Sequence, residues 1–244
     1  MIKAILFDLD GTLLPMDMEV FLKKYFERVT QATAHLLPPR QMAKHILDAT
    51  MAAIDNTDPS KYNVEVFIEA FEQAAGLDRK LVMPVFDEFY EKEFHSLGRD
   101  FPPHPLVPGI IDLCKEKGFR LVLATSPIFP KKAILVRMEW AGLDPEDFEL
   151  ITTYDNMHAT KPHREYYEEI LERLGLEAEE CVMVGNNAEE DLVASKLGMK
   201  VFWLKDYAVL RSDEEPHFDA AGSYQDLYDW LSGLPAAGKG DGDV

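Results

Sequence analysis

Two carboxylates, Asp8 and Asp10, follow directly after the first apolar run of the chain, residues 4–7. In an extended segment, residues i and i+2 project to the same face, so the two carboxylates would lie side by side and repel each other. Asp10 and Gly11 together form a typical turn dipeptide, but a turn does not explain Asp8. We therefore expect positive charge, from the protein or from a metal ion, beside the two carboxylates.

Polar side chains follow the other apolar runs in the same way. The runs are 120–125, 149–153, 181–185 and 201–205. The polar residues at or after their ends are Thr125, Ser126, Asp155, Lys161, Asn186, Glu190 and Asp191. Open α/β sheets bind ligands in the crevice beyond the carboxyl ends of their strands, so we expect these side chains to share one crevice. In that crevice Lys161 and a divalent cation would offset both Asp8 and Asp10.

This set of side chains suits phosphoryl transfer through a carboxylate nucleophile. One aspartate would attack phosphorus and form an aspartyl phosphate, while the other would protonate the leaving oxygen and later activate water. A divalent cation and a lysine would neutralise charge on the transferring group. Hydroxyl and backbone N–H donors would hold the phosphoryl oxygens.

The apolar runs also predict the fold. Their continuous apolar character is typical of strands buried on both faces, as in a parallel sheet covered by helices. Helical patterns over 130–141, 163–174 and 187–197 separate the runs. We therefore expect an α/β fold, a Rossmann-like parallel sheet with helices on both faces, built from residues 1–15 and 104–233.

Residues 16–103 have a different pattern, which predicts a helical insert. Apolar residues recur there at i, i+3, i+4 and i+7, and Gly76 is placed as a helix stop. The stretch 101–109 holds four prolines and predicts a stiff connection at the exit. We expect the insert to lie over the crevice and to move relative to the sheet. Its aromatic residues repeat with helical period and should form its own core: Phe67, Phe71, Phe86, Phe89, Tyr90 and Phe94.

Composition limits the partners that the protein can have. The chain has 244 residues, 47% of them hydrophobic, and a formal net charge of −19, which argues against nucleic acid or an anionic membrane surface as a partner. No apolar stretch approaches the roughly 18 residues that a membrane span requires, so we expect a cytoplasmic protein. The tail, 234–244, should be disordered. The sequence does not indicate an oligomeric state.

The motifs resemble those of a known superfamily. The segment Asp8-Leu9-Asp10-Gly11-Thr12, then Thr125, then Lys161-Pro162, and finally Gly185-Asn186-x-x-x-x-Asp191 are similar in order and spacing to the four motifs of the haloacid dehalogenase superfamily. The helical insert resembles the C1-type cap of its phosphatase branch. The resemblance implies a Mg²⁺-dependent phosphatase that acts on a small phosphorylated metabolite.

The resemblance also implies roles for individual residues. Asp8 would be the nucleophile and Asp10 the general acid/base. Thr125, with Ser126, would bind the phosphoryl group, and Lys161 would stabilise its charge. The magnesium ligands would be Asp8, Asp10 through its carbonyl oxygen, Asn186 and Asp191.

One position departs from the pattern, because the family's phosphatases usually carry Asp where Asn186 stands. An amide oxygen brings no charge to a cation that favours carboxylates, so we expect weaker metal binding. The amide-rich last motif leaves two alternatives open. One is a metal-free dehalogenase, although those enzymes lack an acid at the position of Asp10. The other is a catalytically weak binding or regulatory protein on the same fold.

Overall fold

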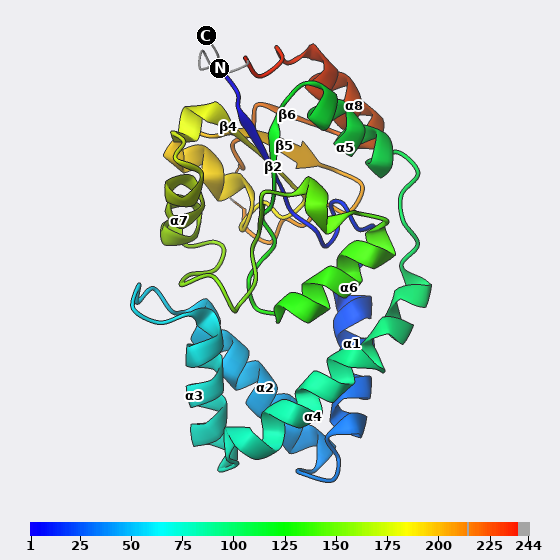
Figure 1. The fold of residues 1–244 in the computed structure, drawn as a ribbon, viewed down its shortest axis with the longest axis vertical. Helices are drawn as coiled ribbons and strands as arrows, with labels where there is room; N and C mark the ends of the chain where they lie inside the picture. Colours follow the sequence, from blue (N-terminus) through cyan, green and yellow to red (C-terminus); the bar gives the residue numbers. More distant parts are fainter. Residues whose placement is uncertain (214, 239–244) are drawn as a thin grey trace.

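A computed structural model describes residues 1–213 and 215–238, and its centre is a six-stranded, all-parallel sheet of order β3-β2-β1-β4-β5-β6 (Figure 1). The strands are β1 (Ala4–Phe7), β2 (Arg120–Leu123), β3 (Leu150–Ile151), β4 (Cys181–Gly185), β5 (Lys200–Leu204) and β6 (Ala220–Gly222). The predicted α/β fold is confirmed. β6 is an addition that the sequence pattern did not single out.

Helices cover both faces of the sheet because successive residues of each strand point to opposite sides. In β1, Ile5 and Phe7 contribute to one buried cluster, and Ala4 and Leu6 to the other. The helices and the 3₁₀ helix of the two layers are α5 (Val107–Glu116), α6 (Lys131–Ala141) and α8 (Tyr224–Gly233) on the first face, and α7 (Arg164–Leu174) and η4 (Leu192–Leu197) on the second.

Two predictions about the core elements were wrong in detail. Residues 187–197 do not form an α-helix: they form turns followed by the short 3₁₀ helix η4. The backbone N–H of Asn187 bonds to the Asp191 carboxylate, and such side-chain bonds compete with helix formation. The proline-rich stretch 101–109 is a connection only in its first part, because α5 begins at Val107 and tolerates Pro108 in its first turn.

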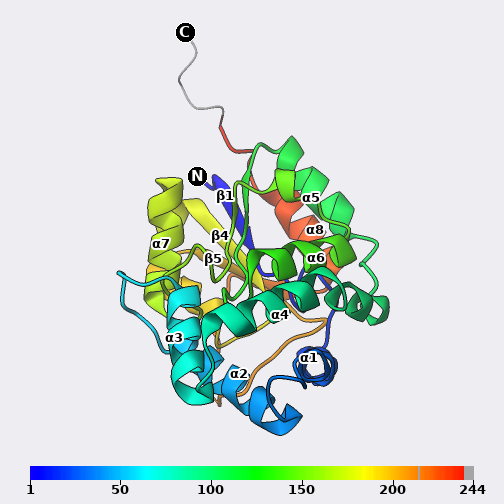
Figure 2. The same cartoon turned by 60° about the horizontal axis from the view of Figure 1, so that its bottom comes forward.

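Four α-helices and one 3₁₀ helix lie between β1 and α5, and we call Met18–Asp100 the helical insert. Its elements are α1 (Met18–Ala32), α2 (Pro39–Ile54), α3 (Asn63–Ala75), α4 (Arg79–Glu91) and η1 (Phe94–Asp100). α3 ends at Gly76, whose φ of 66° is left-handed, as its position predicted. The insert lies at the end of the molecule toward which β1 runs from the N-terminus (Figures 1 and 2).

Aromatic side chains join the insert to the core. The predicted aromatic set is buried, but it does not form a core of the insert alone. The ring of Phe94 stacks on Trp140 of α6 at 5.2 Å, and the ring of Tyr25 lies 5.5 Å from Phe129, which follows β2. Gly98 allows the close approach, because a Cβ there would lie 2.3 Å from the Trp140 ring.

Backbone hydrogen bonds hold the other side of the insert and part of the tail. At the start of α3, the N–H of Asn63 donates to the Met157 carbonyl at 2.9 Å. Ala237, in the tail expected to be disordered, donates its N–H to the Lys117 carbonyl at 2.9 Å, whereas 239–244 lie outside the described residues. Among the helices of the described residues, none has the length and apolar character needed to cross a membrane.

Candidate active site

The carboxyl ends of β1 and β4 form the centre of the candidate site. Asp8 directly follows β1 and Asn186 directly follows β4, and these two strands are neighbours in the sheet. The strand order reverses direction between them, which is where open α/β sheets bind ligands. The N–H of Asp8 donates to the Val184 carbonyl at 2.9 Å and so continues the ladder to the rim of the sheet.

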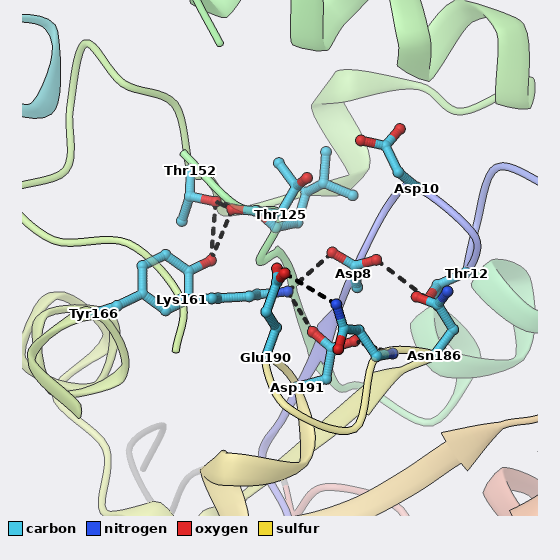
Figure 3. A network of polar contacts seen from close by, with 12 residues as sticks. Asp8, Asp10, Thr12, Thr125, Thr152, Lys161, Tyr166, Asn186, Glu190 and Asp191 are labelled. Carbon is cyan, nitrogen blue, oxygen red and sulfur yellow. Dashed lines mark hydrogen bonds and ion pairs between the residues drawn. The ribbon is translucent and has the colours of Figure 1, made fainter. Parts of the chain in front are cut away.

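Lys161 connects two buried carboxylates in this crevice (Figure 3). Its Nζ lies 2.9 Å from Oδ1 of Asp8 and 2.6 Å from Oδ1 of Asp191, and all three side chains are buried. Burial alone would lower the pKa of the Lys161 ammonium, but the carboxylates of Asp191 and Asp8 outweigh burial and hold that pKa well above its ordinary value. Lys161 is therefore a permanent positive charge next to Asp8.

Asp191 is fixed in place by the turn that follows β4. Its second oxygen accepts the Asn187 N–H at 2.9 Å. Gly185 leaves the space that the carboxylate occupies, since a Cβ there would lie 2.2 Å from it. Burial raises the pKa of Asp191 even though Lys161 opposes the shift. Burial likewise raises the pKa of the neighbouring Glu190, whose carboxylate accepts a hydrogen bond from the Asn187 amide.

Asn186 presents its amide oxygen to the same place as Asp8. Its Nδ2 donates to the Tyr207 carbonyl at 2.7 Å, and because a carbonyl only accepts, the amide oxygen faces the other way. The Thr12 hydroxyl lies 3.2 Å from that oxygen and 3.3 Å from Oδ2 of Asp8. One hydroxyl hydrogen cannot satisfy both oxygens, so the site has spare acceptor capacity. Gly11 permits this close approach, because a Cβ there would meet the Asn186 amide at 2.3 Å.

Asp10 has a different partner from Asp8. Its carboxylate pairs with the guanidinium of Arg137, which lies on α6 and is 1% exposed. Figure 3 shows the Asp10 carboxylate pointing away from that of Asp8. Lys161 forms an ion pair with Asp8, whereas the ion-pair partner of Asp10 is Arg137. The Lys161 charge acts on Asp10 as well, because it lowers the pKa of that carboxyl, but less than Arg137 does. In an extended segment the two would share a face, but Asp10 lies in the turn after β1.

Arg137 is a member of the site that the sequence analysis missed. The guanidinium lies 4.4 Å from the centre of the Phe129 ring, a cation–π contact. Burial raises the pKa of Asp10 to about 6 although the Arg137 charge opposes this shift, so the carboxyl can release and accept a proton near neutral pH. In the sequence, Arg137 is recognisable as a charged residue between two apolar ones, Val136 and Met138. The structure shows that both of these neighbours are buried.

The remaining predicted residues divide into two groups. Thr125 is buried just beyond β2, and its carbonyl accepts hydrogen bonds from the Thr152 hydroxyl at 2.7 Å and the Tyr166 hydroxyl at 3.0 Å. These bonds fix the loop that also carries the half-buried Ser126. Asp155 was expected in the crevice but is exposed, and its carboxylate accepts the Lys131 N–H at the start of α6.

The oxygen atoms of the crevice suit a hard divalent cation. Oδ2 of Asp8 and the Asn186 amide oxygen converge on the Thr12 hydroxyl. The buried carboxylates of Asp8 and Asp191 share one buried ammonium, that of Lys161. In the described part of the chain, no three His, Cys, Asp or Glu side chains converge as metal ligands. Lys161 and the Asn187 N–H bind the two oxygens of Asp191. Oδ2 of Asp8 is not bound by Lys161 and can face a cation together with the neutral Asn186 amide.

Comparisons with known proteins agree with this geometry. The family of haloacid dehalogenase-like hydrolases matches residues 2–197. The glyceraldehyde 3-phosphate phosphatase of Methanothermobacter thermautotrophicus is 27% identical over 236 residues, 96% of this chain and 98% of that one. The pyrophosphatase PpaX of Bacillus pumilus is 26% identical over 206 residues, 82% of this chain and 81% of its own.

Solved structures of the same fold come from two kinds of enzyme. A HAD phosphatase from Thermococcus onnurineus superposes with a TM-score of 0.59 at 23% identity, over 97% of this chain and 100% of the other. The L-2-haloacid dehalogenase of Xanthobacter autotrophicus superposes with a TM-score of 0.55 at 18% identity, over 96% and 100%. These similarities establish the fold and leave the choice of reaction to the residues of the site.

Proposed function

Because this chain belongs to the haloacid dehalogenase-like hydrolases, we propose that it is a phosphatase that cleaves a small phosphorylated compound through an aspartyl phosphate on Asp8. The observation that carries this proposal is the placement of Asp8 at the end of β1, with one oxygen bound to the buried Lys161 ammonium. The relatives named as phosphatases support the same reaction.

Each residue of the site has a step in the proposed reaction. A carboxylate oxygen of Asp8 attacks phosphorus, and a P–O bond forms as the bond to the leaving oxygen breaks. Asp10 gives a proton to that leaving oxygen and then takes a proton from the water that hydrolyses the aspartyl phosphate. Lys161 offsets the negative charge of the phosphoryl group, and the loop of Thr125 and Ser126 supplies its hydrogen-bond donors.

We also propose that Mg²⁺ would be held by Asp8, Asn186, Asp191 and the carbonyl oxygen of Asp10. The convergence of the Asp8 and Asn186 oxygens on one hydroxyl supports this set. When bound, the ion would neutralise charge on the phosphoryl group. Since the side chain of Asn186 is a neutral amide, we expect the affinity for the ion to be modest.

Covalent trapping of the intermediate tests the proposal. The protein is mixed with 4-nitrophenyl phosphate with and without Mg²⁺, quenched with borohydride, and digested for mass spectrometry. Borohydride reduces an acyl phosphate to an alcohol, so residue 8 should be recovered as homoserine after turnover. Phosphate release without modification at Asp8 would contradict the proposed nucleophile.

One alternative reaction deserves a parallel assay because Asn186 removes a carboxylate that Mg²⁺ favours. A metal-free dehalogenase would use Asp8 to displace halide from carbon. Chloride release from 2-chloropropionate, without hydrolysis of any phosphate ester, would favour that reaction. The ion-paired Asp10, whose side chain is 9% exposed, favours the phosphatase, because halide needs no proton to leave.

A further inference from the structure

We propose that the cavity between the helical insert and the loop after β2 binds the leaving group of the substrate, and that this leaving group is apolar: a single aromatic ring or a short alkyl chain. The cavity has a volume of about 210 Å³ and lies between α1, α2, α3, α4 and residues 128–130. The inference rests on the proposed phosphatase activity and specifies its substrate class.

The chemistry of the cavity wall excludes a charged occupant. Within the described residues, no lysine, arginine or histidine lines it, and its walls are aliphatic and aromatic apart from Thr50 and Asp87. The hydroxyls of Tyr25 and Tyr90 lie 2.8 Å apart and bond to each other. The Asp87 carboxylate pairs with Lys132 at 2.9 Å and offers an anion no positive charge. A carboxylate or a second phosphate would therefore lose its hydration without gaining a cationic partner.

The volume limits the size of the occupant. An apolar cavity of about 150 Å³ remains dry and binds benzene, whereas pockets for drug-sized ligands start at about 300 Å³. A cavity of about 210 Å³ lies between these values. It therefore suits one ring with a small substituent, or an alkyl chain of a few carbons, and excludes a nucleoside.

The cavity adjoins the candidate site through two loops. Its wall includes Ile128, which is three residues after Thr125. Its wall also includes Ile54, whose carbonyl accepts the Thr160 hydroxyl at 3.2 Å and lies 2.8 Å from Nε2 of His163. Thr160 and His163 flank Lys161. The loop of Thr125 thus carries a wall of the cavity, and the loop of Lys161 is hydrogen-bonded to the end of α2, which forms another wall.

The proposed acid lies one aromatic ring away from the cavity. The Phe129 ring is part of the cavity wall, and the Arg137 guanidinium lies 4.4 Å from its centre. Arg137 in turn pairs with Asp10. Phe129 therefore contacts both the cavity and the side chain that pairs with Asp10. The rim of the cavity includes Leu47 and Met51, which are 49% and 52% exposed and give the cavity an apolar edge toward solvent.

Substrate preference tests the inference directly. We expect kcat/KM for benzyl phosphate to exceed that for glycerol phosphate and for pyrophosphate by about ten- to a hundredfold, the effect of burying one apolar ring. Benzyl alcohol alone should inhibit competitively against benzyl phosphate. This inhibition is measured on the unaltered protein, so it does not depend on a variant that folds.

A cavity-filling variant adds a second, independent test. Thr50→Phe places a ring in the cavity, and the Thr50 hydroxyl that it removes bonds only within its own helix, to the Ile46 carbonyl. We expect KM for benzyl phosphate to rise about tenfold, and kcat/KM for acetyl phosphate, whose leaving group carries no ring, to fall less. Gln41→Phe is the matched control, because Gln41 is exposed on α2 outside the cavity.

The outcomes separate this inference from the proposed function. Hydrolysis of acetyl phosphate and pyrophosphate without a preference for benzyl phosphate, unaffected by Thr50→Phe, would overturn the inference and leave the phosphatase standing. A folded protein that hydrolyses no phosphate ester or anhydride would overturn both. A preference for benzyl phosphate that Thr50→Phe removes and Gln41→Phe leaves intact supports both.

Discussion

The crevice at the strand ends and the cavity under the insert are adjacent but chemically opposite. The crevice concentrates charge: Asp8, Lys161 and Asp191 form a buried chain of ion pairs on the rim of the sheet. The cavity, among its described lining residues, has one carboxylate at its edge and no basic side chain. The proposed reaction and the proposed choice of substrate therefore depend on separate parts of this fold.

The Asp10–Arg137 pair lies at the boundary between these two regions. Asp10 belongs to the turn after β1, beside the crevice, whereas Arg137 contacts Phe129 in the cavity wall. The boundary is where a leaving oxygen would stand, with the phosphoryl group on one side and the apolar group on the other. The predictions below change residues of the site so that the contributions of the two regions can be measured separately.

The largest effect is expected in the crevice, where Asp8→Asn should abolish turnover. An amide cannot form the acyl phosphate, and no neighbouring group replaces it. Phosphate release from 4-nitrophenyl phosphate is the measurement, with circular dichroism to show that the variant is folded. Near-normal activity in a folded Asp8→Asn protein would show that the nucleophile lies elsewhere.

Asp10→Asn should lower kcat by about 10²- to 10⁴-fold, the usual contribution of a general acid/base. The variant leaves Arg137 without its carboxylate, so its free energy of unfolding should fall as well. The double variant Asp10→Asn with Arg137→Met should regain stability but not activity. Asp155→Asn is the matched control, since Asp155 is exposed at the start of α6, and its kcat should stay unchanged.

Arg137→Met should produce a smaller loss that depends on the leaving group, because Arg137 positions Asp10 rather than touching the substrate. Benzyl phosphate needs a proton on its leaving oxygen, and its kcat/KM, which reports on phosphoryl transfer to Asp8, should fall about tenfold or more. 4-Nitrophenolate leaves without a proton, so kcat/KM for 4-nitrophenyl phosphate should change little. Partial rescue by Arg137→Lys is expected. Equal losses on both substrates would indicate a purely structural role.

The smallest effect is expected for Asn186→Asp, which should strengthen Mg²⁺ binding several-fold, or about 1 kcal/mol. The same change removes the hydrogen-bond donor to the Tyr207 carbonyl and places a carboxylate oxygen of residue 186 against that carbonyl oxygen. Without Mg²⁺ the variant should therefore be less stable by roughly 1–3 kcal/mol. Calorimetric titration and urea unfolding measure the two effects. Asn187→Asp adds the same charge one residue away and should change Mg²⁺ affinity less.

Weaker or unchanged Mg²⁺ binding in folded Asn186→Asp would contradict the proposed metal position. The metal-free dehalogenase reaction would then gain support. If Asn186→Asp without Mg²⁺ keeps the free energy of unfolding of the unaltered protein, the hydrogen bond to the Tyr207 carbonyl contributes little to stability. The two measurements therefore test the electrostatic and the hydrogen-bonding roles of one side chain separately.

Local pattern predicted most of the sheet and the crevice. Continuous apolar runs marked β1, β2, β4 and β5, and parallel strands place the residues after them at one edge, which is why Asp8 and Lys161 were expected together. The pattern failed at 187–197, where side-chain bonds from Asp191 replaced helical ones. It also missed β6, whose three residues are too short to show a period.

The sequence by itself determined the α/β order of elements, the stop at Gly76 and the convergence of charge at the strand ends, because these follow from hydrophobic period and residue type. Only the tertiary structure decided that Asp10 pairs with Arg137, that Asn186 turns its amide oxygen toward Asp8, and that an apolar cavity lies beside the charged crevice. Each of these features joins residues more than 20 positions apart in the sequence. Which residues meet depends on how the helices pack on the sheet. No periodicity along the chain records that docking, since it is set by side-chain shape and by the burial of charge.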